Sequence, residues 1–371
     1  HITNVAVEET GSLRTVIRYD GIHRSSLREE RLPFIIRMEV GHDSAVIKFT
    51  HTFLYDGDED KDFLKGMGIR FLSPMAGELY NRHVKFPGDY GVFHEALVPL
   101  TAWRPKMPIA LYQRQMAGEM LLSGEARQMA DKVLKDAPAW SEYALYRDSA
   151  SHFGIKKKQK GENLCYIESL HGQRAAGAAA FGSEHGSVKA AVRDFWEKYP
   201  SGITCRGLDG ENAECTLWFW SPDAAAMDFR HYADRGYNQV CYEGYDYKGA
   251  TPDGIACTNE CRVAFSDAMI PEDGEVEAFA QSVNHPAVYV GTPEFYHEMR
   301  AFGYWSLPAG EGATETERWL ESQMEQVFDF YKGEIEQRGW YGMFNYGDVM
   351  HTYDSVRHQW KYDMGGYAWD N

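Results

Sequence analysis

The chain has 371 residues and a mass of 42.3 kDa, which is enough for more than one domain and for a large buried core. Hydrophobic residues make up 44% and charged residues 25%, a mixture that excludes a mainly disordered chain. The 38 Lys and Arg against 55 Asp and Glu give a net charge of -17, which repels the phosphate backbone of nucleic acids. No run approaches the ~20 apolar residues that cross a bilayer. From the charge we expect no nucleic-acid partner, and from the lack of such a run we expect no membrane partner.

Both ends of the sequence lie inside patterned segments. The chain begins at His1 with the strand-like TNVAVEE, without a methionine or a signal region, and it ends at Asn371 within a dense aromatic motif. We therefore expect a piece of a longer protein.

The cysteine spacing predicts no metal site, since none of the six forms a CxxC pair. We interpret them as buried thiols. They are Cys165, Cys205, Cys215, Cys241, Cys257 and Cys261.

The first third of the chain is predicted to form antiparallel strands. The runs LRTVIRY, LPFIIRMEV and AVIKFTHTFLY are rich in β-branched and aromatic residues, and the last alternates apolar and polar positions. Tyr19-Asp20-Gly21 and Tyr55-Asp56-Gly57-Asp58 are predicted to be the tight turns between strands, because Asp and Gly tolerate the backbone angles of turns.

The middle of the chain is mixed. A Met- and Ala-rich segment within residues 101–140 could hold a short helix, and strand-like runs resume from Ala144 to Val192. The run Lys156 to Lys160 indicates a charged sheet edge, with a binding role as the alternative. TLWFWSP (216–222) and PAVYVGTP (286–293) are predicted to be strands, so that the β region continues to about residue 305.

A long amphipathic helix is predicted after this β region. Thr314 and Glu317 have the spacing of a capping box, apolar residues follow at helical intervals, and Gly339 supplies a stop. Pro308, Gly310 and Gly312 indicate a linker. We therefore expect one domain over residues 1–308 and a second over residues 309–371.

The segment 340–371 is the richest in groups that can carry out chemistry. His351, Tyr353, Arg357, His358 and Tyr362 crowd together with few aliphatic residues. Trp340, Trp360 and Trp369 offer flat surfaces on which a sugar ring can stack. The alternative is structural, with the aromatic rings packed at a domain junction.

Three further groups in the β region combine an imidazole with a guanidinium, a pairing suited to a carboxylate. Each could equally be a polar network of the surface. They are Asn81, Arg82 and His83; His171 and Arg174; and Arg230 and His231.

Several motifs resemble the rhamnogalacturonan exolyase family, the PcRglX/YetA-like polysaccharide lyases. They are NYGDVMHTYDSVRHQWKYDMGGYAWDN, TLWFWSPDAAAMDFRHY, HTFLYDGDEDKDFLKGMGIRF and YNRHVKF, and the resemblance runs through almost the whole chain. It implies a mainly β chain, in which a large antiparallel β-sandwich precedes the first helix and loop of an α/α toroid. It also implies a barrel before the sandwich and favours a secreted or periplasmic protein.

The resemblance implies β-elimination on an acidic polysaccharide of the rhamnogalacturonan type. This reaction needs a cation beside the C5 carboxylate, a base for the C5 proton and an acid for the leaving oxygen. Arg357 or Arg82 could neutralise, His351 or His358 suits the base, and Tyr353 suits the acid. Asn81, Arg82, His83, His171, Arg174, Arg230, His231, Trp360 and Tyr362 are the predicted substrate contacts. No calcium loop is evident, so we expect neither a metal nor another cofactor.

Two other functions remain open. A glycoside hydrolase would need a carboxylate pair, for which the sequence offers Asp348 with Asp354 or Asp363 with Asp370. A non-catalytic carbohydrate-binding sandwich would need only a groove lined with aromatic residues. The density of His, Tyr and Arg favours the lyase, because hydrolysis of a glycoside does not require it.

Overall fold

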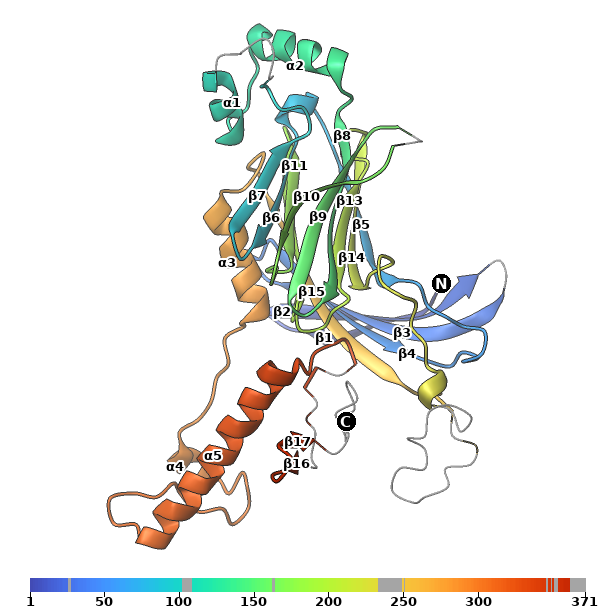
Figure 1. Ribbon diagram of the computed structural model, residues 1–371. Helices are drawn as coiled ribbons and strands as arrows, with labels where there is room; N and C mark the ends of the chain where they lie inside the picture. The colour runs from blue at the N-terminus through green and yellow to red at the C-terminus, as the bar shows by residue number, and fades with distance from the viewer. Residues whose placement is uncertain are drawn as a thin grey trace. The chain divides into compact units, whose positions relative to one another are not determined.

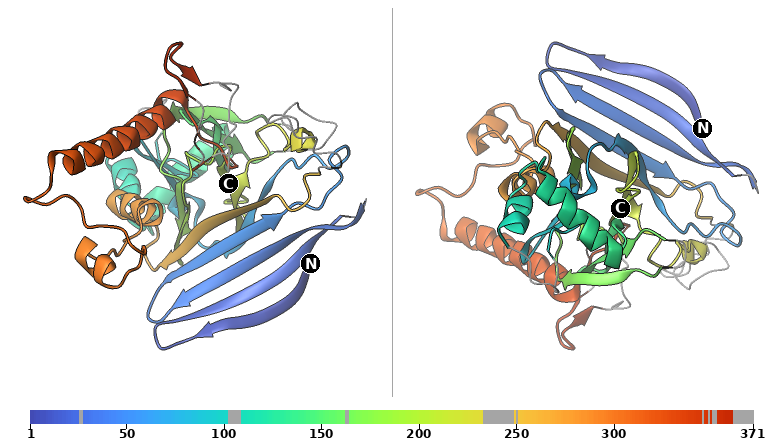
Figure 2. Two further views of the ribbon diagram at one scale, coloured as in Figure 1. Left: turned by 90° about the horizontal axis from the view of Figure 1, so that it is seen from below. Right: turned by 90° about the horizontal axis from the view of Figure 1, so that it is seen from above.

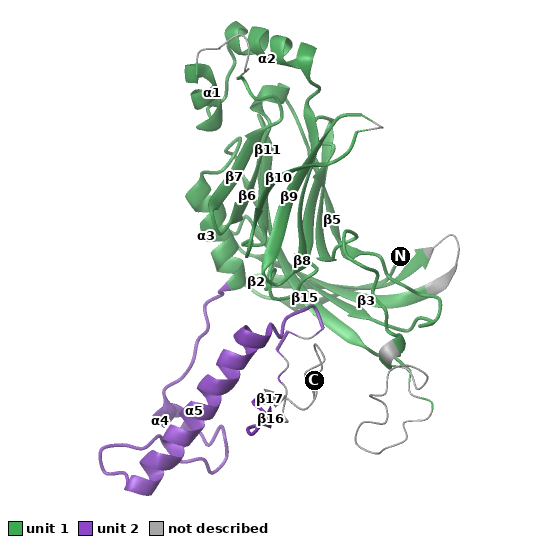
Figure 3. Ribbon diagram, in the orientation of Figure 1, with its two compact units in different colours: residues 1–284 green, residues 285–371 purple. Residues whose placement is uncertain are grey.

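The computed structural model consists of two compact units, residues 1–284 and residues 285–371 (Figure 3). The division follows Asn284 and so precedes the Pro- and Gly-rich segment at which the sequence predicts it. The structure describes residues 1–25, 28–101, 109–161, 164–232, 249, 251–344, 346–347, 349 and 353–360.

A nine-stranded antiparallel sheet forms one layer of the first unit, in the order β1-β2-β3-β4-β15-β12-β11-β6-β7 (Figure 1). Strands β1 to β4 are neighbours in chain order, and Figure 2 shows them in blue as one twisted ribbon. The strands are β1 (Ile2–Thr10), β2 (Arg14–Ser25), β3 (Arg28–Gly41), β4 (Val46–Leu54), β6 (His83–Gly88), β7 (Gly91–Ala96), β11 (Ala178–Ser183), β12 (Gly186–Val192) and β15 (Ala256–Ser266).

A six-stranded antiparallel sheet forms the other layer, in the order β10-β9-β8-β13-β14-β5. The rings of Phe49 on β4 and Phe71 on β5 lie 5.3 Å apart and connect the layers. The strands are β5 (Met67–Pro74), β8 (Trp140–Ser149), β9 (His152–Gln159), β10 (Ile167–Gly172), β13 (Gly202–Arg206) and β14 (Asn212–Trp220).

Side chains that point to the inner face of each sheet form the core between the two sheets. On β8, Tyr143 and Leu145 are buried, and on β9 Phe153 and Ile155 are buried in the same way. Burial of each such side chain contributes about 1.5–3 kcal/mol relative to exposure. The sequence prediction of a mainly β chain with a large antiparallel sandwich is confirmed.

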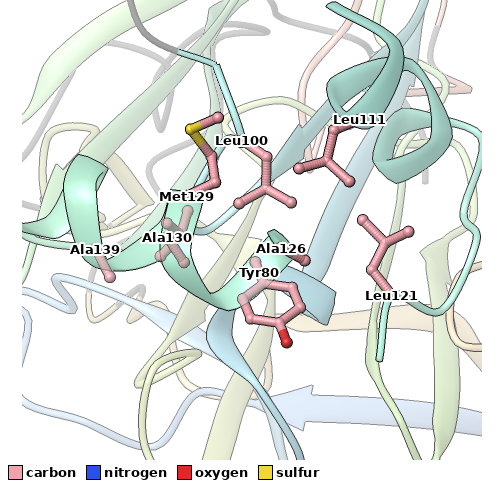
Figure 4. Packing of buried hydrophobic residues seen from close by; sticks show 9 residues of the cluster. Tyr80, Leu100, Leu111, Leu121, Ala126, Met129, Ala130 and Ala139 are labelled. Carbon is pink, nitrogen blue, oxygen red and sulfur yellow. The ribbon is translucent and has the colours of Figure 1, made fainter. Parts of the chain in front are cut away.

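Two helices cover one end of the first unit. Helices α1 (Ile109–Met116) and α2 (Gly124–Asp136) pack Leu111 and Met129 against Tyr80 and Leu100 (Figure 4). The side chain of Ser123 accepts a hydrogen bond from the backbone N–H of Ala126 and caps α2. These helices fall where the sequence predicts a short helix.

Helix α3 (Asp273–Asn284), which the sequence analysis missed, packs on the large sheet. Phe279 and Val283 contact the small side chains of Ala178 and Ala191, which let a helix approach the strands closely. This packing places the end of the first unit at Asn284.

The second unit contains α4 (Pro293–Glu298), α5 (Glu315–Arg338) and a two-stranded hairpin of β16 (Tyr353–Asp354) and β17 (Gln359–Trp360). The predicted start and stop of the long helix are confirmed. Thr314 and Glu317 form the reciprocal capping box, and Gly339 ends α5 with a left-handed φ of 63°.

Two predictions of local structure are wrong. PAVYVGTP forms no strand and leads into α4, because Pro286 lacks an N–H and Pro293 begins the helix. Tyr19-Asp20-Gly21 is no turn but part of β2, where a side chain on Gly21 would collide with the ring of Phe34.

The Lys156 to Lys160 run is not at the edge of its sheet. It lies mostly in β9, which β10 covers on one side and β8 on the other. Lys157 pairs with Glu95 in the sandwich, whereas Lys156 and Lys158 project from the opposite face of the small sheet.

Candidate functional site

The β16–β17 hairpin carries the predicted catalytic residues that the structure describes. Tyr353 pairs with Trp360, and Asp354 with Gln359, so that residues 355–358 form the tight turn between them. Arg357 and His358 are both exposed in this turn, and His358 has a positive φ of 53°. The turn therefore presents a guanidinium and an imidazole from adjacent residues to solvent.

The packing of Tyr353 on α5 supports this hairpin. Its ring lies 5.1 Å from that of Phe330 in an edge-on arrangement. Tyr353 also belongs to the cluster around Trp340, which includes Tyr331 and Ile335 of α5. The long helix thus gives the base of the hairpin a rigid support.

Several predicted site groups lie outside the described residues. They are His351 and Tyr362, the side chains of His231, Asp354 and Trp360, and the carboxylates of Asp348, Asp363 and Asp370. Their roles stay predictions.

Asn81 and Arg82 are buried in the first unit and bond to its own backbone. The amide of Asn81 donates to the carbonyl oxygen of Leu121 at 3.1 Å and to Glu184 Oε1 at 2.7 Å. Arg82 donates to the carbonyl oxygens of Leu208, Gly210 and Gly77 at 2.8, 2.5 and 3.2 Å. These bonds show a framework role, and the predicted contact of Asn81 and Arg82 with substrate stays untested.

His83 belongs to a buried pair of imidazoles. Its Nδ1 lies 3.0 Å from Nε2 of His94, which lies diagonally across from it on the neighbouring strand β7. Burial lowers the pKa of His83 to about 3 and that of His94 to about 4. Both rings are therefore neutral at physiological pH, so His83 supplies no positive charge for a substrate carboxylate.

His171 lines a groove at the edge of the sandwich. The groove has a volume of about 670 Å³ and is lined by Tyr90, Glu168, Ser169, Leu170 and His171. Tyr90 is 73% exposed, and Ser169 Oγ is buried with no hydrogen-bond partner among the described residues. The exposed ring of Tyr90 and the exposed imidazole of His171 are thus available to a ligand here, whereas the buried hydroxyl of Ser169 is not.

Asp89 holds this groove in shape. Its Oδ2 accepts hydrogen bonds from the backbone N–H groups of Gln173 at 2.8 Å and Arg174 at 3.2 Å. The guanidinium of Arg174 stacks on the ring of Trp196 at 3.8 Å. His171 therefore lies near the end of β10 and Arg174 just after it, in a segment fixed to the β6–β7 hairpin by Asp89.

The sequence analysis missed Tyr90, Ser169, Asp89 and His94. The segment Gly88-Asp89-Tyr90-Gly91 carries a turn signal with one large ring, which could have indicated an exposed aromatic residue. Nothing in the local sequence places this turn beside His171, since the two lie on different sheets and meet only through the packing of the sandwich.

Arg230 lies apart from this groove, in a short 3-10 helix η2 (Arg230–Tyr232). Its guanidinium pairs with the carboxylate of Asp228 and lies 5.1 Å from the centre of the Phe63 ring. Asp228 compensates its charge, and its predicted contact with substrate stays untested.

Among the described residues, no group of three His, Cys, Asp or Glu side chains could hold a metal ion. Cys205, Cys215 and Cys261 are buried free thiols, as predicted, whereas Cys165 is exposed.

No helix in the described part of the chain is long and apolar enough to cross a membrane.

Comparison with solved structures finds sugar enzymes at low similarity. A putative aldose 1-epimerase from Escherichia coli K12 is 9% identical, with a TM-score of 0.29 over 71% of this chain and 68% of that chain. The α-galactosidase AgaA of Geobacillus stearothermophilus is 10% identical, with a TM-score of 0.31 over 72% of this chain and 26% of that chain. Likenesses this weak carry no argument about function.

Comparison of sequences is more informative. The chain is 38% identical over all 371 residues to a Bacillus subtilis (strain 168) protein named "Uncharacterized protein YetA", of which it spans 43%. Residues 1–281 match the model of the PcRGLX-like protein central β-sandwich domain. Residues 286–371 match that of the PcRGLX-like protein C-terminal α/α toroid domain. The chain therefore belongs to the family of PcRGLX-like proteins.

Proposed function

We propose that this chain takes part in the cleavage of a rhamnogalacturonan-type polymer by β-elimination. The observation that carries the proposal is the turn of the β16–β17 hairpin, which exposes Arg357 and His358 side by side. Membership of the PcRGLX-like family supports a substrate related to rhamnogalacturonan.

Each step of the elimination has a candidate residue. The guanidinium of Arg357 would bind the C5 carboxylate of a uronic acid and make the neighbouring proton more acidic. The imidazole of His358, or of His351, would remove that proton. The phenol of Tyr353 would give a proton to the departing 4-oxygen, which completes the double bond between C4 and C5.

The groove of the first unit supplies candidate substrate contacts. Tyr90 offers a face for a sugar ring, and His171 offers a hydrogen-bonding group. Arg174 offers a cation close to His171 in the sequence. We assign these three residues to substrate binding.

Substitutions in the hairpin test the proposal in the protein at its full natural length. His358→Gln and Tyr353→Phe should each reduce turnover of rhamnogalacturonan on the order of 100-fold. Val356→Ala is the matched control, because Val356 is 87% exposed in the same turn and carries no proton-transfer group. Near-normal elimination by folded His358→Gln and Tyr353→Phe variants would remove these residues from the mechanism.

A further inference from the structure

The outer face of the small sheet carries an alternating row of rings and glycines. Cross-strand pairing aligns six residues of six strands in one row, and directly paired residues of antiparallel strands share a face. From β10 to β5 the row is His171, Gly154, Tyr146, Gly202, Trp218 and Gly68.

Gly154 gives the ring of Tyr146 room to lie along the sheet. A Cβ on Gly154 would lie only 2.6 Å from the ring of Tyr146, so this ring extends across the Gly154 backbone. The phenol of Tyr146 then donates to Glu168 Oε1 at 3.3 Å, on the next strand but one. A larger residue at position 154 would tilt the ring away from the sheet.

The ring of Trp218 is held by a hydrogen bond to the neighbouring strand. Its indole N–H donates to Thr204 Oγ1 at 3.0 Å on the neighbouring strand. Trp218 remains partly exposed, whereas Thr204 is only 7% exposed. The ring therefore lies over the strand and keeps a surface for a ligand.

A cation lies beside this row. Lys156 Nζ is 5.1 Å from the centre of the Tyr146 ring, 4.9 Å from that of Tyr166 and 2.6 Å from Asp223 Oδ1. The ammonium group of Lys156 is thus held over the rings of Tyr146 and Tyr166, and the carboxylate of Asp223 compensates its charge.

We propose that this face is an extended binding surface for an oligosaccharide chain. Tyr146 and Trp218 are separated by one intervening strand, so their backbones lie about 9–10 Å apart. This spacing suits every second unit of a chain. Rhamnogalacturonan alternates a neutral sugar with a uronic acid, so that equivalent sugars recur at every second unit. The choice of this polymer rests on the function proposed above.

The test measures polymer binding apart from cleavage, by affinity electrophoresis in native gels containing soluble rhamnogalacturonan, with dextran as the neutral comparison. The protein carries His358→Gln at its full natural length, so that it does not consume the polymer. Adding Trp218→Ala or Tyr146→Ala should weaken retardation roughly 5- to 10-fold. Adding Phe265→Ala, at a 52% exposed ring of β15 on the other sheet, should leave it unchanged.

A glycine variant tests the row without deleting a ring. Gly154→Ala should also weaken retardation, because it displaces Tyr146, whereas Gly124→Ala should not, since no atom lies within 4 Å of a Cβ there. Melting temperatures identify any variant that is merely unfolded.

The outcomes separate this inference from the proposed lyase function. Unchanged retardation of all three face variants overturns the inference, even if the wild type cleaves the polymer. A change of oligomeric state in Trp218→Ala also overturns it, because the face would then join two copies of the chain. Selective loss of retardation, in a protein whose wild type forms no unsaturated product, supports the binding surface and contradicts the lyase.

Discussion

The histidines of this chain fall into two groups by their surroundings. His51, His83 and His94 are largely buried, and burial lowers their pKa values to about 4, 3 and 4. His171 and His358 are exposed. The buried group is held in the neutral form and largely out of contact with solvent, so we look for the base among the exposed histidines and not in the motif around His83.

Glu197 predicts a dependence of stability on pH. Burial raises its pKa to about 7, so the folded state favours the protonated carboxyl. The stabilising effect of this proton is complete below pH 4.5, the unfolded value, and is lost as the pH rises through about 7. Glu197→Gln should therefore raise the free energy of unfolding at pH 8 by about 1–2 kcal/mol, after allowance for partial exposure.

Urea unfolding at pH 5 and pH 8 measures this effect. Glu277→Gln, at an exposed position of α3, is the matched control and should show no such gain. Equal stability differences at the two pH values would show that Glu197 is not the titrating group.

Substitution of Arg357 tests whether its planar guanidinium binds the substrate carboxylate. Arg357→Lys keeps the charge but loses the planar fork that binds two carboxylate oxygens, so turnover should fall about 10-fold or more. If the lysine variant matches the wild type while Arg357→Gln is inactive, charge alone is sufficient and the fork is not needed.

The secondary structure was predictable where local rules act alone. The alternation of β4, the start of α5 at Thr314 and its end at Gly339 follow from periodicity and capping. Helix α3 was missed because its place depends on small alanines of distant strands. Gly21 was misread as a turn because its reason is the ring of Phe34 on the next strand, which the local sequence does not reveal.

The candidate site also contains residues that the local sequence predicts and residues that only the fold reveals. The sequence pattern singled out Arg357 and His358, which are adjacent and share one turn. The ring row from His171 to Trp218 depends on strand pairing between segments far apart in the chain, and the place of Tyr90 beside His171 depends on the packing of the two sheets. Such residues can be found only once the register and packing of the strands are known.

The capping box predicts the stability of α5. The side chain of Thr314 accepts from the N–H of Glu317 at 3.3 Å, and Glu317 Oε2 accepts from the N–H of Thr314 at 2.7 Å. Thr314→Ala should lower the free energy of unfolding of the second unit by about 1 kcal/mol. Urea unfolding followed by circular dichroism measures this loss, and Glu325→Ala in the exposed middle of α5 is the control. Equal stability of Thr314→Ala and wild type would mean that the cap contributes nothing.

The two units differ in how much apolar surface they bury. The first has several buried clusters between its sheets and under its helices. In the part of the second unit that the structure describes, a small cluster surrounds Trp340, while α5 exposes a series of large apolar side chains. These are Trp319, Leu320, Met324, Val327 and Phe328.

This difference predicts the behaviour of the separate units. Residues 1–284 should fold alone and unfold in one cooperative transition, whereas residues 285–371 alone should give a broad transition and expose apolar surface to a fluorescent dye. Thermal unfolding of the two polypeptides checks this. A sharp transition for residues 285–371 would show that the second unit is independently stable.

The chemical identity of the product tests the lyase function most directly. The protein at its full natural length is incubated with rhamnogalacturonan while ultraviolet absorbance and new reducing ends are followed together. Because elimination leaves a double bond between C4 and C5, we predict that absorbance rises in proportion to the reducing ends. Reducing ends without absorbance would identify a hydrolase, and the absence of both would leave a protein that only binds carbohydrate.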